Sequence, residues 1–388
     1  MQRGMECGLT RLRRRRCLMC YWHDGAFVAH GYPRLSPTVL HPVAAEILSA
    51  FDDWTEPGKV VENLDGFDRE SVEQAVEVLR RDGLLLEDGG VEADEDERIA
   101  RQWGPWAPEA SLYHYSTQDE PYTRIDPIAD HLEPVTEEQE PDFAVGRRTH
   151  TLVTCYPDAR RLLLPRTPAR LTEPFDHVLY GRRTHRDFTD QPVPLQTLST
   201  LLAVVFGPVD FIDSGRSTLM RRTSAAGGSR QELDAYLGIR NVTGVPAGIY
   251  HYNILEHSLE LISEGLTRDG VVELCAMQPW AGGTAFLVVL SAVIDRMLSK
   301  YRNPRSYRVC LLNAGHLGQT FALTATALGL GPFQTAAFND SAVARACGLD
   351  NIAHTPLYIL AAGHPAHEQA MAPPPAELGT FSRTTFQQ

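Results

Sequence analysis

The sequence predicts a domain that mixes helices with a β-sheet, preceded by a smaller and mostly helical module. Strand-like and helical patterns alternate between residues 147 and 365, and apolar residues recur at helical spacing before residue 98. A stretch rich in aromatic, acidic and proline residues separates the two parts. We therefore divide the chain into residues 1–98, a connector at 99–146, a larger domain at 147–365 and a mobile tail at 366–388.

The N-terminal module has the element order of a winged-helix-like fold. Its first helix begins near His41, and its apolar residues repeat on one face: Val43, Ile47, Leu48 and Phe51. A short helix at residues 59–63 follows, and then a helix capped by Asp68 and closed by Gly83, which suits the left-handed position after a helix. Leu84–Leu86 is predicted to be a short strand. We expect such a module to bind a peptide or a partner protein.

The charge of the chain argues against nucleic acid as a partner. Residues 41–88 carry 13 acidic and 4 basic side chains, and the whole chain has a formal net charge of -13. Basic contacts to phosphate supply most non-specific affinity for DNA, so an acidic module is a poor DNA binder. The longest apolar run, Trp280–Ile294, is 15 residues long, whereas a membrane span needs about 20. We expect neither nucleic acid nor a membrane as a partner.

The sequence also predicts a cytoplasmic protein without a bound metal. No apolar signal-peptide core follows the basic stretch Arg11–Arg16, and seven cysteines are too few for a disulfide scaffold. A zinc site is a rival interpretation, because four potential ligands lie near the N-terminus: Cys7, Cys17, Cys20 and His23. Their spacing is irregular, so unpaired thiols in a β-element are favoured.

The connector begins with an acidic run and an aromatic segment. Glu92–Glu97 contains no large apolar residue, and we expect it to be a solvated linker. The aromatic segment after it should pack against a core or a domain interface: Trp103, Trp106, Leu112, Tyr113 and Tyr115. Residues 121–146 are rich in proline and glutamate, which predicts irregular structure.

The larger domain shows strands separated by helices. The predicted strands are Thr149–Tyr156, Ala235–Arg240, Gly248–Tyr252, Ala285–Ile294 and Pro356–Ala362. The predicted helices are Leu195–Phe206, His316–Leu330 and Asp340–Cys347. The second of these helices carries small residues on nearly every face, which indicates a buried central helix.

Two segments of this domain could hold an anionic, flat ligand. Gly181–Arg186 places three guanidinium groups and a hydroxyl within a few residues, a donor set suited to phosphate oxygens. Thr223–Arg230 is a small-residue turn that lets the backbone approach a flat ligand closely. Taken alone, the first segment is better explained as a solvated charge cluster, and the second is weak evidence. Together they lead us to expect that both segments converge around one ligand.

A third segment, Lys300–Arg308, brings an amine and a phenol together, and Asn313–Thr320 follows it. Within the latter, His316 is better explained as a core or helix-start histidine than as a catalytic base.

Six segments resemble, in order and spacing, the SagB-type dehydrogenases of the nitroreductase superfamily. They are Arg182–Phe188, Ser224–Tyr236, Gly248–Tyr252, Lys300–Arg308, Ala314–Gln319 and Ala327–Phe338. Ala110–Tyr115 resembles, more loosely, the peptide-maturation dehydrogenase branch. The resemblance implies an α+β nitroreductase-like mixed sheet with surrounding helices, and FMN bound at a homodimer interface. It also implies oxidation of a precursor peptide, typically azoline to azole, with a cyclodehydratase or another maturation enzyme as a partner.

The resemblance also assigns roles to individual residues. It implies that the FMN phosphate and ring edge are held by Arg182, Arg183, Thr184 and Arg186. The isoalloxazine would be lined by Ser224, Ala225, Ala226, Gly227 and Gly228, with the backbone of Gly329 and Gly331 on its other side. Lys300 and Tyr301 match the catalytic Lys-Tyr pair of the family. Two positions depart from the family pattern, because Ala226 replaces a serine and Asn313 replaces an acidic residue.

The chemistry of such a step explains these residue types. A two-electron oxidation needs an electron sink that no side chain supplies and that a flavin provides. Lys300 is the candidate base, which requires burial or nearby cations because a free lysine has a pKa of about 10.4. Tyr301 could donate a hydrogen bond or deliver a proton. Without the family match, an exposed solubilising lysine is the competing interpretation.

Two other functions fit the sequence less well. One keeps the flavin and reduces small nitro or quinone compounds with NAD(P)H. The other is a flavin-free scaffold that only binds a peptide or partners, which the departures at Ala226 and Asn313 suggest. A flavin absorbance band in the purified protein excludes the scaffold, and NAD(P)H consumption without peptide favours the reductase.

Overall fold

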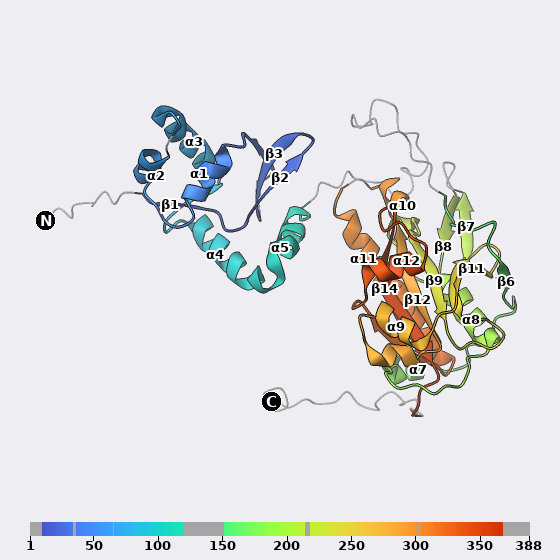
Figure 1. Ribbon diagram of the computed structural model, residues 1–388. Coiled ribbons are helices and arrows are strands. Elements are labelled where there is room, and N and C mark those ends of the chain that lie inside the picture. Colours follow the sequence, from blue (N-terminus) through green and yellow to red (C-terminus); the bar gives the residue numbers. More distant parts are fainter. Residues whose placement is uncertain are drawn as a thin grey trace. The chain divides into compact units, whose positions relative to one another are not determined.

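Figure 1 shows the protein as a computed structural model, which describes residues 10–33, 36–64, 66–119, 151–213, 218–301 and 303–367. The chain forms two compact units, Met1–Pro121 and Tyr122–Gln388. The predicted boundary at residue 98 therefore lies inside the first unit. The predicted start of the larger domain at 147 and the tail beyond residue 367 lie outside the described residues.

Within its described residues, the first unit consists of short helices and two small antiparallel sheets. Strand β1 pairs with β5, and β2, β3 and β4 form a three-stranded sheet. In chain order the elements are β1 (Leu12–Arg14), β2 (Leu18–His23), β3 (Ala26–Gly31), β4 (Thr38–Leu40), α1 (Ala44–Ala50), α2 (Pro57–Asn63), α3 (Arg69–Arg81), β5 (Leu85–Glu87), α4 (Val91–Trp103), the 3-10 turn η1 (Gly104–Trp106) and α5 (Ala107–Ser116).

The predicted order of helix, short helix, helix and strand is confirmed by α1, α2, α3 and β5. Asp68 caps α3, because its carboxylate accepts the Ser71 N–H at 3.0 Å. Gly83 follows this helix with a φ of 71°, the left-handed conformation that glycine adopts without strain. Apolar side chains of α1, α2 and α3 pack with β1, β3 and β5 into one core. The winged-helix identity of the unit stays a prediction.

The prediction of a solvated linker at Glu92–Glu97 is wrong, because these residues lie in the first half of α4. Asp96 is fully buried, and its carboxylate accepts the backbone N–H groups of Arg16 and Cys17, both at 2.9 Å. The Arg13 guanidinium lies 3.2 Å from the same carboxylate. A buried carboxylate is stable only when it is paired and hydrogen-bonded, and here the partners come from about 80 residues earlier in the chain.

The aromatic segment packs as predicted, and its partner is the core of the first unit. The Tyr115 ring stacks on Tyr32 with ring centroids 6.0 Å apart, and Trp103 and Leu112 pack on the same cluster. Trp106 is the exception, with 71% of its surface exposed. The connector predicted to begin at residue 99 therefore starts as part of the first unit.

The second unit contains one large sheet with the strand order β13-β14-β12-β9-β10-β11-β6, in which all neighbours are antiparallel. A separate hairpin is formed by β7 and β8. In chain order the described elements are β6 (Arg161–Leu163), α7 (Phe175–Gly181), α8 (Leu195–Phe206), β7 (Asp210–Asp213), β8 (Thr218–Arg221), η3 (Gly227–Ser229), β9 (Leu233–Ile239), β10 (Gly248–Asn253), β11 (Ser258–Glu264), α9 (Arg268–Leu274), η4 (Pro279–Gly283), β12 (Phe286–Val293), α10 (Ile294–Leu298), α11 (Ser306–Ala327), β13 (Gly331–Thr335), α12 (Asp340–Ala346) and β14 (His354–Gly363).

Most predicted elements of this unit are confirmed, with two differences. The helix predicted to begin at His316 is α11, which begins ten residues earlier at Ser306. No strand forms in the described part of the predicted Thr149–Tyr156 strand. Side chains hold that backbone instead, because Arg296 donates to the Thr151 carbonyl at 2.9 Å and Glu260 accepts the Tyr156 N–H at 3.1 Å. Among the described helices, none combines the length and apolar character that a bilayer span requires.

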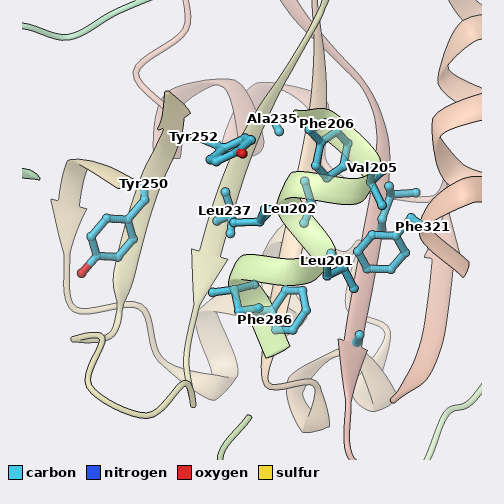
Figure 2. Packing of buried hydrophobic residues seen from close by; sticks show 14 of the residues in the cluster. Leu201, Leu202, Val205, Phe206, Ala235, Leu237, Tyr250, Tyr252, Phe286 and Phe321 are labelled. Carbon is cyan, nitrogen blue, oxygen red and sulfur yellow. The ribbon is translucent and has the colours of Figure 1, made fainter. Parts of the chain in front are cut away.

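The sheet of the second unit is covered on both faces, because successive residues of a strand point to opposite sides. In β12, Phe286, Val288 and Leu290 pack with α8 and α11, whereas Leu287 and Val289 pack with α9 and α12. Figure 2 shows the first of these layers, where side chains of α8 and α11 meet the strands: Leu201, Leu202, Val205, Phe206, Leu237 and Phe321. The candidate site residues lie at the ends of this sheet, outside both core layers.

Candidate functional site

The pairing of β9 with β12 decides which candidate residues meet. The two strands are antiparallel neighbours, with Leu233 opposite Ala292. The small-residue turn precedes β9, and Lys300–Tyr301 follows β12 through α10. The start of one antiparallel strand lies beside the end of its neighbour, so the turn and the Lys-Tyr pair share one end of the sheet.

The turn packs directly on Tyr301. Gly228 has a φ of 63°, and a Cβ atom added to it would lie 2.3 Å from the Tyr301 hydroxyl oxygen and 2.8 Å from a ring carbon. A Cβ added to Gly227 would lie 2.3 Å from a Val309 methyl carbon. Real Cβ atoms essentially never approach this closely, so any larger residue at either position would displace Val309 or Tyr301.

Three side chains spaced along α11 hold this turn in place. Asn313 accepts the Gly227 N–H at 3.1 Å, His316 Nδ1 lies 3.0 Å from the Ala225 carbonyl, and Thr320 lies 2.6 Å from the Ser224 hydroxyl. Residues separated by three, four or seven positions share one face of a helix, which explains why these contacts fall in a row. His316 is exposed in the middle of α11, so the predicted core or helix-start position is wrong. Its contact is to the turn backbone.

Lys300 and Tyr301 are held by the preceding helix. Their backbone N–H groups both donate to the Met297 carbonyl, at 3.1 and 2.8 Å. Arg296 anchors α10 in the core, because its guanidinium is 2.6 Å from the Asp234 carboxylate and is almost fully buried. The Lys300 ammonium lies 5.3 Å from the centroid of the Tyr301 ring, a cation–π distance. Lys300 is partly exposed, so it can reach a ligand beside Tyr301.

A pocket lies on the Tyr301 side of the turn. Its volume is about 130 Å³, and it is lined by Gly227, Tyr301, Asn303, Arg305, Ser306 and Val309. It lies next to the phenol and the turn backbone, so a small flat group bound there would contact both. Arg302, which belongs to the same Lys300–Arg308 segment, is outside the described residues.

The arginine-rich segment lies at the start of β13. The His185 N–H donates to the Pro332 carbonyl at 3.0 Å, and a Cβ added to Gly331 would lie 2.7 Å from the His185 ring. Burial lowers the pKa of His185, and Arg182 lowers it further, so this imidazole is neutral at pH 7. Gly329, at the end of α11, has a φ of 73° and no atom within 4 Å of an added Cβ.

The arginine side chains form a donor set suited to an anion. Among the described residues, none of Arg182, Arg183 and Arg186 forms an ion pair with a carboxylate. Arg183 donates to the Tyr180 carbonyl at 2.7 Å, and Arg186 lies 5.7 Å from the Trp280 ring. Thr184 is exposed between them. A phosphate fits this set, because guanidinium groups bind its oxygens and no carboxylate competes.

The two groups of candidate residues lie at opposite ends of the sheet within one chain. Gly331 pairs with Gly363 on β14, and its neighbour Ala362 pairs with Phe286, the first residue of β12. Lys300 and the turn lie beyond the other end of β12, and eight residues of an antiparallel strand span about 24 Å. Figure 1 shows the same separation between α7 at the bottom and α10 at the top. Within one chain, Lys300 and the arginine-rich segment therefore lie beyond opposite ends of β12. That the arginine-rich segment and the turn converge around one ligand stays a prediction.

Sequence reasoning also missed two buried charges next to the turn, Arg222 and Glu232. Glu232 is 1% exposed, and its carboxylate accepts from the Asn313 amide at 2.9 Å. The sequence contained one signal, since a carboxylate just before the apolar strand β9 has no place in an apolar core without a partner. Nothing local in the sequence identified that partner as Asn313, which lies 81 residues later.

The rival zinc interpretation finds only part of its ligand set. Cys7 is outside the described residues, and Cys17 is buried with its thiol 3.5 Å from the Asp96 carbonyl. Burial raises the pKa of Cys17 to about 12, which disfavours a thiolate ligand. Cys20 and His23 lie three residues apart on β2, so they point to opposite faces. Among the described residues, no three metal-binding side chains form a cluster.

Comparison with known families identifies the second unit. Residues 179–364 match the model of the nitroreductase family. The chain contains a nitroreductase-family domain. Its sheet with helices on both faces has the α+β composition expected for that family.

Two relatives of this nitroreductase-family domain are named for the processing of trifolitoxin and of microcin B17. The trifolitoxin-processing protein TfxB of Rhizobium leguminosarum bv. trifolii is 30% identical, over 34% of this chain and 36% of its own. The microcin B17-processing protein McbC of Escherichia coli is 28% identical, over 42% of this chain and 60% of its own. A Methanocaldococcus jannaschii protein named as a nitroreductase is 27% identical, over 43% of this chain and 81% of its own. The chain thus matches less than two thirds of the length of the two peptide-processing relatives.

Two solved structures are among those similar to this chain. A chain of the E. coli microcin synthetase McbBCD complex is 22% identical, with 68% of this chain and 96% of that chain covered and a TM-score of 0.41. A Ralstonia eutropha protein named as a nitroreductase is 24% identical, with 56% of this chain and 94% of that chain covered and a TM-score of 0.45.

Proposed function

We propose that the protein is an FMN-dependent dehydrogenase that oxidises a ribosomally made peptide, converting azoline to azole or making a similar two-electron desaturation. The observation that carries this proposal is the packing of the Gly228 turn on Tyr301, with the Lys300 ammonium over the same ring. The nitroreductase-family domain and the peptide-processing relatives support it.

The residues on each half of the site fit FMN. The phosphate would be bound by the guanidinium groups of Arg182, Arg183 and Arg186 and by the Thr184 hydroxyl. Among the described residues, none of these guanidinium groups forms an ion pair with a carboxylate. The backbone from Ser224 through Ala225 and Ala226 to Gly228 would line the ring, and Gly329 and Gly331 would approach it from the arginine side. When bound, FMN supplies the two-electron acceptor that the protein lacks.

The protein's own groups would orient the peptide and move a proton. Lys300 would remove a proton from the substrate carbon or nitrogen, because its amine lies 5.3 Å from the centroid of the Tyr301 ring, and Tyr301 lines the pocket. The Tyr301 hydroxyl would donate a hydrogen bond to the electron-rich atom of the ring being oxidised. Gly228 fixes the position of that hydroxyl, since the turn leaves no space on one side of the Tyr301 ring.

A homodimer would unite the two halves of the site. Helix α11 runs between the two ends and exposes apolar side chains in its first half: Tyr307 at 42%, Leu311 at 45% and Leu312 at 62%. The neighbouring helix α7 exposes Phe175 at 68%. An apolar helix face in water favours a partner surface. In a two-fold dimer, the arginine-rich segment of one copy can face the turn of the other.

The first unit would bind the precursor peptide or a maturation enzyme such as a cyclodehydratase. Its winged-helix-like order of helices and its separate core support a distinct binding module. The acidic balance of residues 41–88 favours a protein or peptide over nucleic acid.

Mass spectrometry tests the proposed reaction. The full chain is reconstituted with FMN and incubated with a synthetic thiazoline-containing peptide, and each oxidation removes the mass of two hydrogen atoms. We expect this loss with the wild type, none with Lys300→Ala, and flavin retained in that variant. Oxidation at the wild-type rate by Lys300→Ala would refute the assigned base. NAD(P)H consumption without peptide would favour the small-molecule reductase, and a colourless protein that binds no FMN would favour the scaffold.

A further inference from the structure

A small polar cavity lies behind the turn that contacts Tyr301. Its volume is about 10 Å³, and Ala225 and Ala226 of the turn form one wall. The opposite walls include Arg222, Glu232 and Asn313. One water molecule needs roughly 10–15 Å³ of such space together with polar partners. The cavity therefore has the size and the chemistry of a site for a single water.

Two buried polar atoms at this cavity need a partner. Among the described residues, neither the Arg222 Nε nor the Glu232 Oε2 atom has a hydrogen-bond partner of good geometry, and the Cys310 thiol, a weak donor, faces the same carboxylate. Arg222 is 9% exposed and Glu232 is 1% exposed, so bulk water does not solvate either group. One atom is a donor and the other an acceptor, which is the pair that one bridging water satisfies. Leaving such an atom unsatisfied destabilises the fold, because its lost hydration is not replaced.

The other oxygen of Glu232 is linked to the turn through one side chain. The Asn313 amide nitrogen donates to Glu232 Oε1 at 2.9 Å, and the Asn313 amide oxygen accepts the Gly227 N–H at 3.1 Å. An N–H group can only donate, so the amide oxygen of Asn313 must face Gly227 and its nitrogen must face Glu232. Gly227 directly precedes the residue that packs on Tyr301.

We propose that this cavity is an internal water site, and that Glu232 is a positioning residue for the turn beside Tyr301. The water links Glu232 to Arg222, and Asn313 links Glu232 to Gly227. The relay stands on hydrogen bonds within the chain, and only its effect on FMN rests on the proposed function. This relay holds the turn backbone against α11, while the opposite side of the turn contacts Tyr301.

The positive charges near Glu232 are sufficient to stabilise one carboxylate at this position. Arg222 faces it from the segment after β8, Arg296 from α10, and the Cys310 thiol and Asn313 from α11, and Asp234 lies two residues later in β9. Burial raises the pKa of Glu232, whereas the Asn313 hydrogen bond and both arginines oppose that shift. Burial also raises the pKa of Cys310 to about 12, so this thiol stays neutral. A second carboxylate in place of Asn313 would have no additional cation to pair with.

A charge-placement experiment on the full chain tests the relay. Asn313→Asp places two carboxyl groups at the 2.9 Å contact, and two carboxylates at such a contact cannot both ionise readily. At about pH 8 we expect a lower melting temperature and FMN affinity weakened at least about tenfold, with both recovering towards about pH 5.5 as one proton enters the pair. Asn351→Asp, on the exposed loop before β14, is the control with the same charge change.

The double variant Glu232→Gln with Asn313→Asp distinguishes a relay from damage to the fold. It restores a single carboxyl group, because the new glutamine amide can donate to the aspartate, which still accepts from Gly227. We expect its melting temperature to return towards that of the wild type and its FMN affinity to come within about threefold of the wild-type value. Neither quantity should then show the pH dependence of Asn313→Asp. If the double variant is as impaired as Asn313→Asp, or if Asn313→Asp behaves like Asn351→Asp, the relay is refuted.

Two further readouts separate the parts of the proposal. Failure of the wild type to bind FMN would overturn the proposed cofactor, while the melting temperatures of the four proteins would still decide the relay. A crystal structure should show one ordered water within hydrogen-bond distance of Arg222 Nε and Glu232 Oε2. A cavity that is dry or closed by a side chain would overturn the water site.

Discussion

Replacing Gly228 by alanine tests whether the turn sets the position of Tyr301. The new Cβ would lie 2.3 Å from the phenolic oxygen, so the Tyr301 ring must move by about 1 Å to reach van der Waals distance. The left-handed backbone, with a φ of 63°, adds a cost of roughly 1–2 kcal/mol for any residue with a Cβ. A misplacement of about 1 Å at a catalytic group can lower a rate about 100-fold.

Gly244 supplies the matched control, because its φ is 77° and an added Cβ would meet no atom within 4 Å. Both variants share the cost of the left-handed backbone, about 2–4 °C in melting temperature for each kcal/mol in a domain of this size, and Gly228→Ala adds the cost of displacing Tyr301. Only Gly228→Ala should also lose peptide oxidation, by about 100-fold. Equal oxidation rates in the two variants would show that the contact between the turn and Tyr301 does not set the activity.

Three other expectations follow from the described contacts. Leu312→Asp on α11 should give a monomer that loses FMN, as measured by light scattering and flavin absorbance. The control Ile352→Asp, on an exposed loop where Ile352 is 82% exposed, should stay dimeric. A dimeric Leu312→Asp would refute the α11 interface. Burial alone would raise the pKa of Asp234, but Arg296 and hydrogen bonds outweigh burial, so the net shift lowers this pKa. The ionised Asp234 therefore stabilises the fold above about pH 4, and this stabilisation is lost as the pH falls through the lowered pKa. Asp234→Asn should therefore melt lower at neutral pH, by the equivalent of about 3–5 kcal/mol, and lose part of the acid dependence of melting; an unchanged acid profile would contradict this. Among the six described cysteines, iodoacetamide should label exposed Cys20 and Cys155 before the buried thiols by peptide mapping, and early labelling of Cys17 would contradict its burial.

The elements that the sequence predicted correctly are those with a strong local signal. Helix α8 matches the predicted Leu195–Phe206, because its apolar residues repeat over three turns. The Asp68 cap was visible because capping depends only on residues within the first turn of a helix. The left-handed φ of 63° at Gly228 is also a local requirement, whereas its contact with Tyr301 comes from a residue 73 positions later.

The errors arose where distant residues decide the outcome. Glu92–Glu97 looked like a solvated linker, and only the Arg13–Cys17 segment makes a buried Asp96 possible. Arg222 and Glu232 were missed for the same reason, because their environment is completed by α11. Motif order along the chain was correct, but it carried no information about which end of the sheet each motif would reach.

Strand direction accounts for the separation of the two half-sites. In an antiparallel sheet, the turn before β9 lies at the end where β12 finishes, whereas the segment next to β13 lies where β12 begins. Within one copy, Lys300 and the arginine-rich segment lie beyond opposite ends of β12, which spans about 24 Å, and this separation favours the proposed site between two copies. A two-fold axis near the middle of α11 exchanges the two ends of that helix between copies, and each dimer would then contain two complete and equivalent sites. The exposed apolar residues in the first half of α11 lie on the helix that such an axis would pair with its copy.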